Sequence, residues 1–140
     1  MTRAVFVDSN LWLYQLLDLQ AVDKSARIRA ALIGIERLVI SHQVLVEVGA
    51  NLVKKSKLPE ATIRAHLADL ISSCDVVPVD GRVIMRASAL REAGSWSYWD
   101  SLIVTAALEN GCDELWSEDL HHGQLIESRL RIINPLLPRM

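Results

Sequence analysis

Short apolar, β-branched runs alternate along this chain with segments whose apolar residues recur at helical spacing. Strands separated by helices favour a parallel sheet that is covered by helices on both faces. The alternation therefore predicts an α/β fold. Five runs predict strands: AVFV at 4–7, RLVI at 37–40, DVVPV at 75–79, DELW at 113–116 and LRIIN at 130–134.

Capping residues predict where the helices between these strands begin and end. Ser and Asp accept hydrogen bonds from the first N–H groups of a helix, proline suits its first turn, and glycine often follows its last residue. The expected N-caps are Asp23, Ser41 (for a helix through Lys55), Asp80 and Ser97, with Pro59 in a first turn and Gly34, Gly94 and Gly111 at helix ends.

Composition allows one globular domain over residues 1–140. Hydrophobic residues make up 51% of the chain and charged residues 23%, so a sizeable core can form. Charges interrupt the apolar runs before any reaches the roughly 20 residues that span a bilayer. The first apolar run stops at Asp8, too early for a signal peptide, so we expect a soluble, cytoplasmic protein without membrane attachment.

Net charge and cysteine content exclude two further classes. The formal net charge of −2 argues against binding nucleic acid by bulk positive charge, although local basic surfaces remain open. Cys74 and Cys112 lie in no metal-binding or redox spacing, so we expect buried free thiols.

Carboxylates follow two of the predicted strands. Asp8 comes directly after the strand in VFVDSN, and Asp119 lies shortly after Leu115 and Trp116 in LWSEDL. Sites in open parallel sheets gather beyond the carboxyl ends of the strands. These two acids are therefore expected on one rim of the sheet.

Two more acids lie in predicted helices. Asp100 falls on the apolar stripe of SYWDSLIVTAAL, where a carboxylate is unfavourable unless it has a partner. It either joins a site or completes a capping box with Ser97. Glu47 in SHQVLVEV, taken alone, is expected to be an exposed helical glutamate.

These motifs occur in a fixed order: strand-Asp-Ser-Asn, a helical Glu, Ser-x-x-Asp opening an apolar helix, and a late Ser-Glu-Asp. In this order they resemble the PIN-domain nucleases, especially the small VapC-like toxins of bacterial toxin–antitoxin pairs. The resemblance spans nearly the whole chain. It implies a three-layer α/β/α sandwich with a short, mainly parallel sheet, ribonuclease activity that depends on Mg²⁺ or Mn²⁺, and inhibition by a VapB-like antitoxin. The acidic site it implies consists of Asp8, Glu47, Asp100 and Asp119.

Convergence of carboxylates has a chemical rationale. Neighbouring carboxylates repel one another unless a hard cation or shared protons compensate, and Mg²⁺ and Mn²⁺ prefer oxygen ligands. We assign Asp8 and Asp100 as direct ligands, Asp119 as a ligand directly or through water, and Glu47 as a residue that helps to hold the metal or orients the attacking water. Asn10 and Ser117 are candidates for hydrogen bonds to these carboxylates or to phosphate; alternatively, Asn10 caps a helix and Ser117 starts a turn.

Histidine and tryptophan carry weaker signals. His121 and His122 adjoin the acidic segment, but a magnesium site does not require them, and exposed loop positions are expected. The four tryptophans can stack on unpaired bases, although packing in the core or in a homodimer is the safer interpretation. They are Trp12, Trp96, Trp99 and Trp116.

Other functional classes remain as alternatives. Phosphatases of the haloacid-dehalogenase type need Asp-x-Asp after the first strand, whereas Asn10 stands at the third position here. A receiver domain requires paired early acids and a late lysine, and neither is evident. Two alternatives remain: an RNA-processing PIN nuclease outside a toxin–antitoxin pair, and a non-catalytic PIN-like interaction module.

Overall fold

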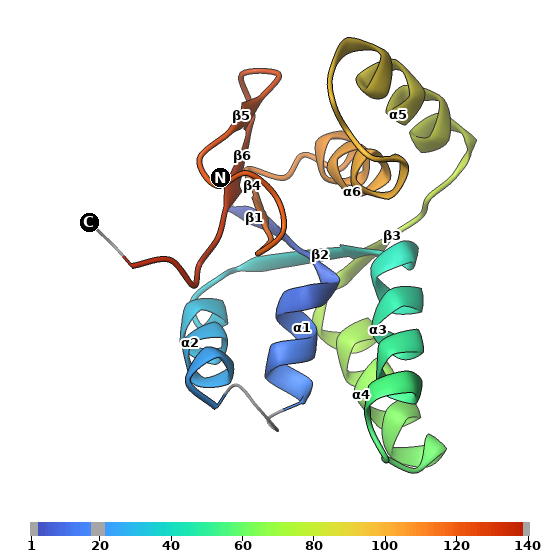
Figure 1. Ribbon diagram of the computed structural model, residues 1–140, viewed down its shortest axis with the longest axis vertical. Helices are drawn as coiled ribbons and strands as arrows, with labels where there is room; N and C mark the ends of the chain where they lie inside the picture. Colours follow the sequence, from blue (N-terminus) through green and yellow to red (C-terminus); the bar gives the residue numbers. More distant parts are fainter. Residues whose placement is uncertain (1–2, 18–21, 139–140) are drawn as a thin grey trace.

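The computed structural model describes residues 3–17 and 22–138, which form a six-stranded sheet between two layers of helices (Figure 1). The strand order is β3-β2-β1-β4-β6-β5, and every neighbouring pair is parallel except β5 with β6. The strands are β1 (Ala4–Val7), β2 (Arg37–Ser41), β3 (Asp75–Val77), β4 (Glu114–Trp116), β5 (Leu125–Ile126) and β6 (Leu130–Ile133). The predicted α/β/α architecture is confirmed.

The helices divide between the two faces of this sheet. They are α1 (Ser9–Leu16), α2 (Val22–Leu32), α3 (His42–Lys55), α4 (Glu60–Ser73), α5 (Gly81–Ala93) and α6 (Tyr98–Glu109). Figure 1 shows α1 to α4 on one face and α5 with α6 on the other. Among the described residues no helix has both the length and the apolar character needed to cross a membrane.

The direction of chain travel explains this division and locates a crevice. From β1 the chain steps outward to β2 and β3, then returns past β1 to β4 on its other side. Crossovers between parallel strands are right-handed, so reversing the direction of travel moves the connecting helices to the opposite face. The strand order thus reverses between β1 and β4, and a crevice opens at the carboxyl ends of these two strands.

The core sits on both faces of the central strands. All four residues of β1 are buried, which is expected for a central parallel strand that reads as an unbroken apolar run. Helix α6 is buried from Ser101 to Leu108, because it lies between the sheet and α5. An all-round apolar helix of this kind belongs inside a protein. Strand β1 leads into Asp8 and helix α6 begins with Asp100 in its first turn, so both acids are held on rigid backbone at the crevice.

Most predicted boundaries are confirmed, and the exceptions are small. Ser41, Asp80 and Ser97 cap α3, α5 and α6 through their side chains. Asp23 is not an N-cap, because α2 begins at Val22 and places Asp23 in its first turn. Pro59 is the N-cap residue of α4 instead of a first-turn residue.

Candidate active site

Asp8 links β1 to α1 and is the most buried acid at the crevice. It is only 8% exposed, and its carboxylate accepts hydrogen bonds from the Ser9 N–H at 2.7 Å and from Ser117 Oγ at 2.9 Å. Burial raises the pKa of this carboxyl above its ordinary range, and the two hydrogen bonds partly offset the rise. The negative charges of Asp100 and Asp119 raise it further.

The segment after β4 carries Asp119 to the same place. Asn10, on α1, donates from Nδ2 to Asp119 Oδ2 at 3.0 Å. Ser117, which is fully buried, accepts a hydrogen bond from the Asp119 N–H at 3.2 Å while it donates to Asp8. Asn10 and Ser117 therefore join the ends of β1 and β4, and the helix-cap alternative for Asn10 is wrong because Asp8 occupies the N-cap of α1.

Glu47 belongs to this cluster and is not the exposed helical glutamate that its local sequence indicated. It is half-buried on α3, and its buried Oε1 has no hydrogen-bond partner in the described structure. Burial raises the pKa of Glu47, the charges of Asp8 and Asp100 add to this effect, and a hydrogen bond with the Gln43 side chain partly offsets it. A buried carboxylate oxygen without a partner is costly, so it indicates a site that binds something.

Asp100 lies in the first turn of α6 and is half-buried. Its backbone N–H donates to Ser97 Oγ at 3.1 Å, which is one half of a capping box. The return bond, from the Ser97 N–H to the Asp100 carboxylate, is not formed between these two described residues. The carboxylate therefore serves no cap, and its charge acts on both Asp8 and Glu47.

The donor set fits a hard divalent cation, but the side chains do not yet form a complete chelate. All four acids offer carboxylate oxygens, and Glu47 Oε1 is unpartnered. In the described part of the chain, no three His, Cys, Asp or Glu side chains are close enough together to hold a metal ion as they are placed. A cation held by one or two carboxylates with waters, as Mg²⁺ often is, fits this arrangement.

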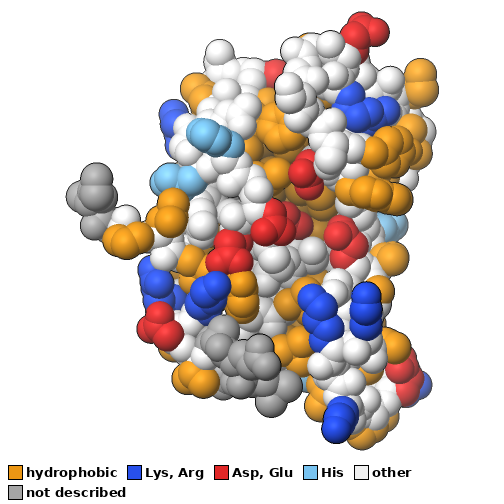
Figure 2. Space-filling model, viewed as in Figure 1, with side chains coloured by type: hydrophobic (Ala, Val, Ile, Leu, Met, Phe, Trp, Pro, Cys, Tyr) orange, Lys and Arg blue, Asp and Glu red, His pale blue; other side chains and the backbone are white. Residues whose placement is uncertain are grey.

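Acidic side chains gather on one face of the molecule (Figure 2). Figure 2 shows Asp and Glu side chains gathered across the middle of one face, between the α5–α6 layer and the layer that contains α1 and α3. Such a concentration of negative charge disfavours a bound phosphodiester unless a cation compensates it.

The sequence did not predict the contacts among three residues beside the site. Tyr14 on α1 donates to Glu118 Oε1 at 2.5 Å, and Lys24 on α2 donates to Glu118 Oε2 at 3.1 Å. Lys24 also donates to the Tyr14 hydroxyl at 3.1 Å. We call these three residues the Glu118 cluster. It fastens the segment that carries Asp119 to α1 and α2, and the only sequence signal for it was the position of Glu118 between Ser117 and Asp119.

The histidines and most tryptophans lie outside the acidic site. His122 Nδ1 accepts a hydrogen bond from the Asn134 N–H at 2.9 Å, and His121 and His122 are exposed. Trp12 and Trp116 are buried, and Trp96 is half-buried against the core. Trp99 differs, since it is 64% exposed.

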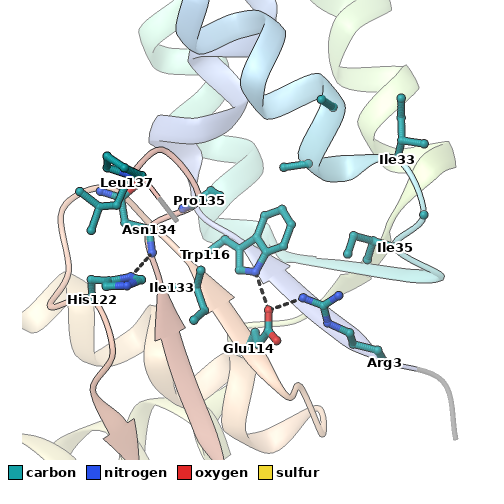
Figure 3. A pocket seen from close by; sticks show the side chains of 14 residues that line it. Arg3, Ile33, Ile35, Glu114, Trp116, His122, Ile133, Asn134, Pro135 and Leu137 are labelled. Atoms are coloured by element: carbon teal, nitrogen blue, oxygen red, sulfur yellow. Dashed lines mark hydrogen bonds and ion pairs between the residues drawn. The ribbon is translucent and has the colours of Figure 1, made fainter. Parts of the chain in front are cut away.

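A separate groove of about 700 Å³ runs between the end of α2 and strands β4 and β6 (Figure 3). Trp116 donates to Glu114 on its wall, Glu114 pairs with Arg3, and the exposed Ile33 lies at its edge. None of the four acids lines this groove.

Comparisons with known proteins agree with this architecture. The family model of the PIN domain matches residues 5–125, whereas no curated protein matches the sequence. Among solved structures, a toxin–antitoxin complex from Klebsiella pneumoniae is similar at 17% identity and a TM-score of 0.69, over 94% of this chain and 97% of that chain.

Two further structures show the same fold. VapC20 from Mycobacterium tuberculosis, described as a toxin that cleaves the sarcin–ricin loop, has 17% identity and a TM-score of 0.66 over 82% of this chain and 91% of its own. VapBC2 from Rickettsia felis, bound to promoter DNA, has 16% identity and a TM-score of 0.67 over 94% and 99%. At identities this low, structural similarity shows a shared fold only. The function must be inferred from the residues of the site.

Proposed function

This chain belongs to the PIN domain family, and from that premise we propose that it is a divalent-metal-dependent ribonuclease. The observation that carries the proposal is the convergence of four acids at the reversal of strand order, two of them with pKa values raised by burial and by their neighbours. Groups perturbed in this way cluster at functional sites.

Each acid has a distinct part in the proposal. Asp8 and Asp100 hold Mg²⁺ or Mn²⁺, and Asp119 contributes directly or through a water. When bound, the cation supplies charge neutralisation at the phosphodiester and acidifies a coordinated water. Glu47, with its unpartnered Oε1, orients the attacking water or accepts its proton.

Asn10 and Ser117 orient two of the four carboxylates. Ser117 donates to Asp8, and Asn10 donates to Asp119, so each fixes the orientation of one carboxylate. Such supporting hydrogen bonds tune how strongly a carboxylate binds metal. Their positions across the β1–β4 boundary make both carboxylates part of one rigid unit.

The biological setting we propose is a toxin held in check by a VapB-like antitoxin, with the toxin forming a homodimer. The support is the fold shared with the Klebsiella complex and with VapBC2, both of which are described as toxin–antitoxin assemblies. A short reading frame for a DNA-binding protein directly upstream of this one is the expected genetic context, and its absence favours an RNA-processing nuclease.

RNA cleavage by site variants tests the proposal. We expect the purified protein to cleave a mixed-sequence RNA with Mn²⁺ and to stop when a chelator is added. Asp8→Asn and Asp100→Asn should each lower the rate at least a hundredfold, because both cation binding and charge neutralisation suffer. Asp69→Asn is the matched control, since this exposed α4 carboxylate takes part in no hydrogen bond or ion pair with the described residues.

Two results contradict the assignment. Near wild-type cleavage by either site variant would remove that acid from the site. A folded wild-type protein that cleaves no RNA with either cation would favour the alternative of a non-catalytic interaction module, whose acids are structural.

A further inference from the structure

Two exposed aromatic rings stand at the start of α6. Tyr98 is 48% exposed and Trp99 is 64% exposed, and their ring centroids lie 5.2 Å apart in an edge-to-face arrangement at 83°. The other tryptophans are buried or half-buried. An exposed tryptophan leaves a large apolar face in water, which is unfavourable unless a ligand covers it. We call Tyr98 and Trp99 the aromatic pair.

The aromatic pair is attached to the elements that carry the acids. Trp99 directly precedes Asp100 in the first turn of α6. Its backbone carbonyl accepts a hydrogen bond from Gln43 Nε2 at 3.3 Å, and Gln43 lies one turn before Glu47 on α3. The backbone of Trp99 is therefore held between the helices that provide Asp100 and Glu47.

A cationic side chain contacts the Tyr98 ring of the pair. The Arg91 guanidinium sits 4.7 Å from the centroid of the Tyr98 ring, and Arg91 Nη1 donates to Ser101 Oγ at 2.8 Å. These two contacts fix the guanidinium on α5 and α6. The exposed ring of Trp99 near a fixed positive charge matches the two parts of a nucleotide, a base that stacks and a phosphate that is anionic.

We propose that the aromatic pair stacks an unpaired base next to the phosphodiester that the acidic site cleaves. This inference rests on the proposed ribonuclease function and adds to it a requirement for an unpaired base beside the cleaved bond. Because Trp99 adjoins Asp100 in the chain, the proposal places the base of the cleaved or the adjoining nucleotide against the Trp99 ring. A base inside a duplex has both faces covered by its neighbours, so the site takes RNA with an unpaired base at this position.

Kinetics with three matched RNA oligonucleotides test this specificity. They share one sequence and are single-stranded, fully duplexed, or single-stranded with one abasic nucleotide beside the cleavage site. On the intact single strand, Trp99→Ala should raise KM about tenfold with little change in kcat, and Trp99→Phe should restore much of the loss because it keeps a stacking ring. On the abasic strand the wild type and Trp99→Ala should have the same KM.

A matched control removes an exposed apolar side chain elsewhere. Ile33 is 81% exposed in the separate groove, so Ile33→Ala should leave KM unchanged on all three RNAs. An unaltered KM for Trp99→Ala on the intact single strand overturns the inference. So does a loss that is equally large on the abasic strand, because stacking on the missing base cannot then be its cause.

Two independent measurements separate this inference from its rivals. Binding of the single strand should quench tryptophan fluorescence in the wild type and much less in Trp99→Phe, with no need for cleavage; equal quenching overturns the inference even if RNA is cleaved. Light scattering measures whether the wild type and Trp99→Ala are dimers or monomers. If Trp99→Ala converts a dimer into monomers and its KM defect persists on abasic RNA, a second copy of the chain covers the pair and the base-stacking proposal is wrong.

Discussion

Asp100→Asn removes one negative charge from the acidic site without removing a side-chain hydrogen bond. The backbone N–H of Asp100 donates to Ser97 and its carboxylate makes no hydrogen bond with the described residues, whereas the charge of that carboxylate raises the pKa of Asp8 and of Glu47. Two unit charges about 8 Å apart repel by about 2 kcal/mol at an effective dielectric constant of ~20. Because Asp100 and Glu47 are only half-buried, about 1 kcal/mol for each pair is the appropriate scale.

One favourable interaction opposes this gain. Asp100 lies in the first turn of α6, where a negative charge interacts with the helix dipole by about 0.5 kcal/mol. Repulsion is the larger effect, so in chelator the variant should be more stable than the wild type by about 1.5 kcal/mol. For a chain of this size that difference corresponds to a melting temperature higher by about 5 °C.

Manganese should reverse the order. A cation that binds only the folded state stabilises it by about 2.7 kcal/mol at a hundredfold excess over Kd, and the variant binds this cation more weakly. Thermal melts of both proteins in EDTA and in millimolar Mn²⁺ measure the effect. Glu60→Gln is the matched control, because it removes an exposed first-turn carboxylate from α4 and therefore changes only the helix-dipole interaction.

A simple cap gives a different pattern. If Asp100 acts only on its helix, Asp100→Asn should behave like Glu60→Gln, with a slightly lower melting temperature in EDTA and the same difference in Mn²⁺. Such a result would refute the shared acidic site, whatever the cleavage assay shows.

Two further outcomes follow from the same contacts. Because burial raises the pKa of Asp8 and Glu47, the folded state binds more protons than the unfolded state above about pH 4, so the unfolding free energy in chelator should fall as pH rises through the raised values. Urea unfolding at a series of pH values measures this slope, which Glu47→Gln should reduce; an unchanged slope contradicts the prediction. Tyr14→Phe removes the hydroxyl that bonds Glu118 and Lys24, so it should lower the unfolding free energy by about 1 kcal/mol and weaken Mn²⁺ binding in a thermal-shift titration. Unchanged Mn²⁺ binding would mean that the Glu118 cluster stabilises the fold without positioning Asp119.

The sequence predicted five strands in their correct places because each is a short, mostly apolar run. It missed β5, which pairs with β6 around a turn at Glu127 and Ser128. Both turn residues have positive φ, a conformation that glycine and asparagine usually supply in two-residue hairpins. Without that signal, and with only two residues in β5, the hairpin could not be recognised from sequence.

The site was predictable where an acid follows a strand and less so within helices. Asp8 was recognisable because a parallel strand fixes the edge of the sheet at which it ends. Glu47 was misread when taken alone, because the apolar residues around it do not reveal which face of α3 meets α6. Similarly, the Glu118 cluster joins residues more than 90 positions apart in sequence, and local spacing carries no information about such a contact.

Of the four acids, Asp8 and Asp119 are held by side-chain hydrogen bonds, whereas Asp100 and Glu47 can adjust. Asp8 accepts two hydrogen bonds inside the protein, from Ser9 and Ser117, so its orientation is set before any ligand arrives. Within the described part of the chain, neither the Asp100 carboxylate nor Glu47 Oε1 makes a hydrogen bond. Ordering their side chains costs conformational entropy, which cation binding must offset. Part of the binding free energy of a cation would therefore go into ordering the Asp100 and Glu47 side chains.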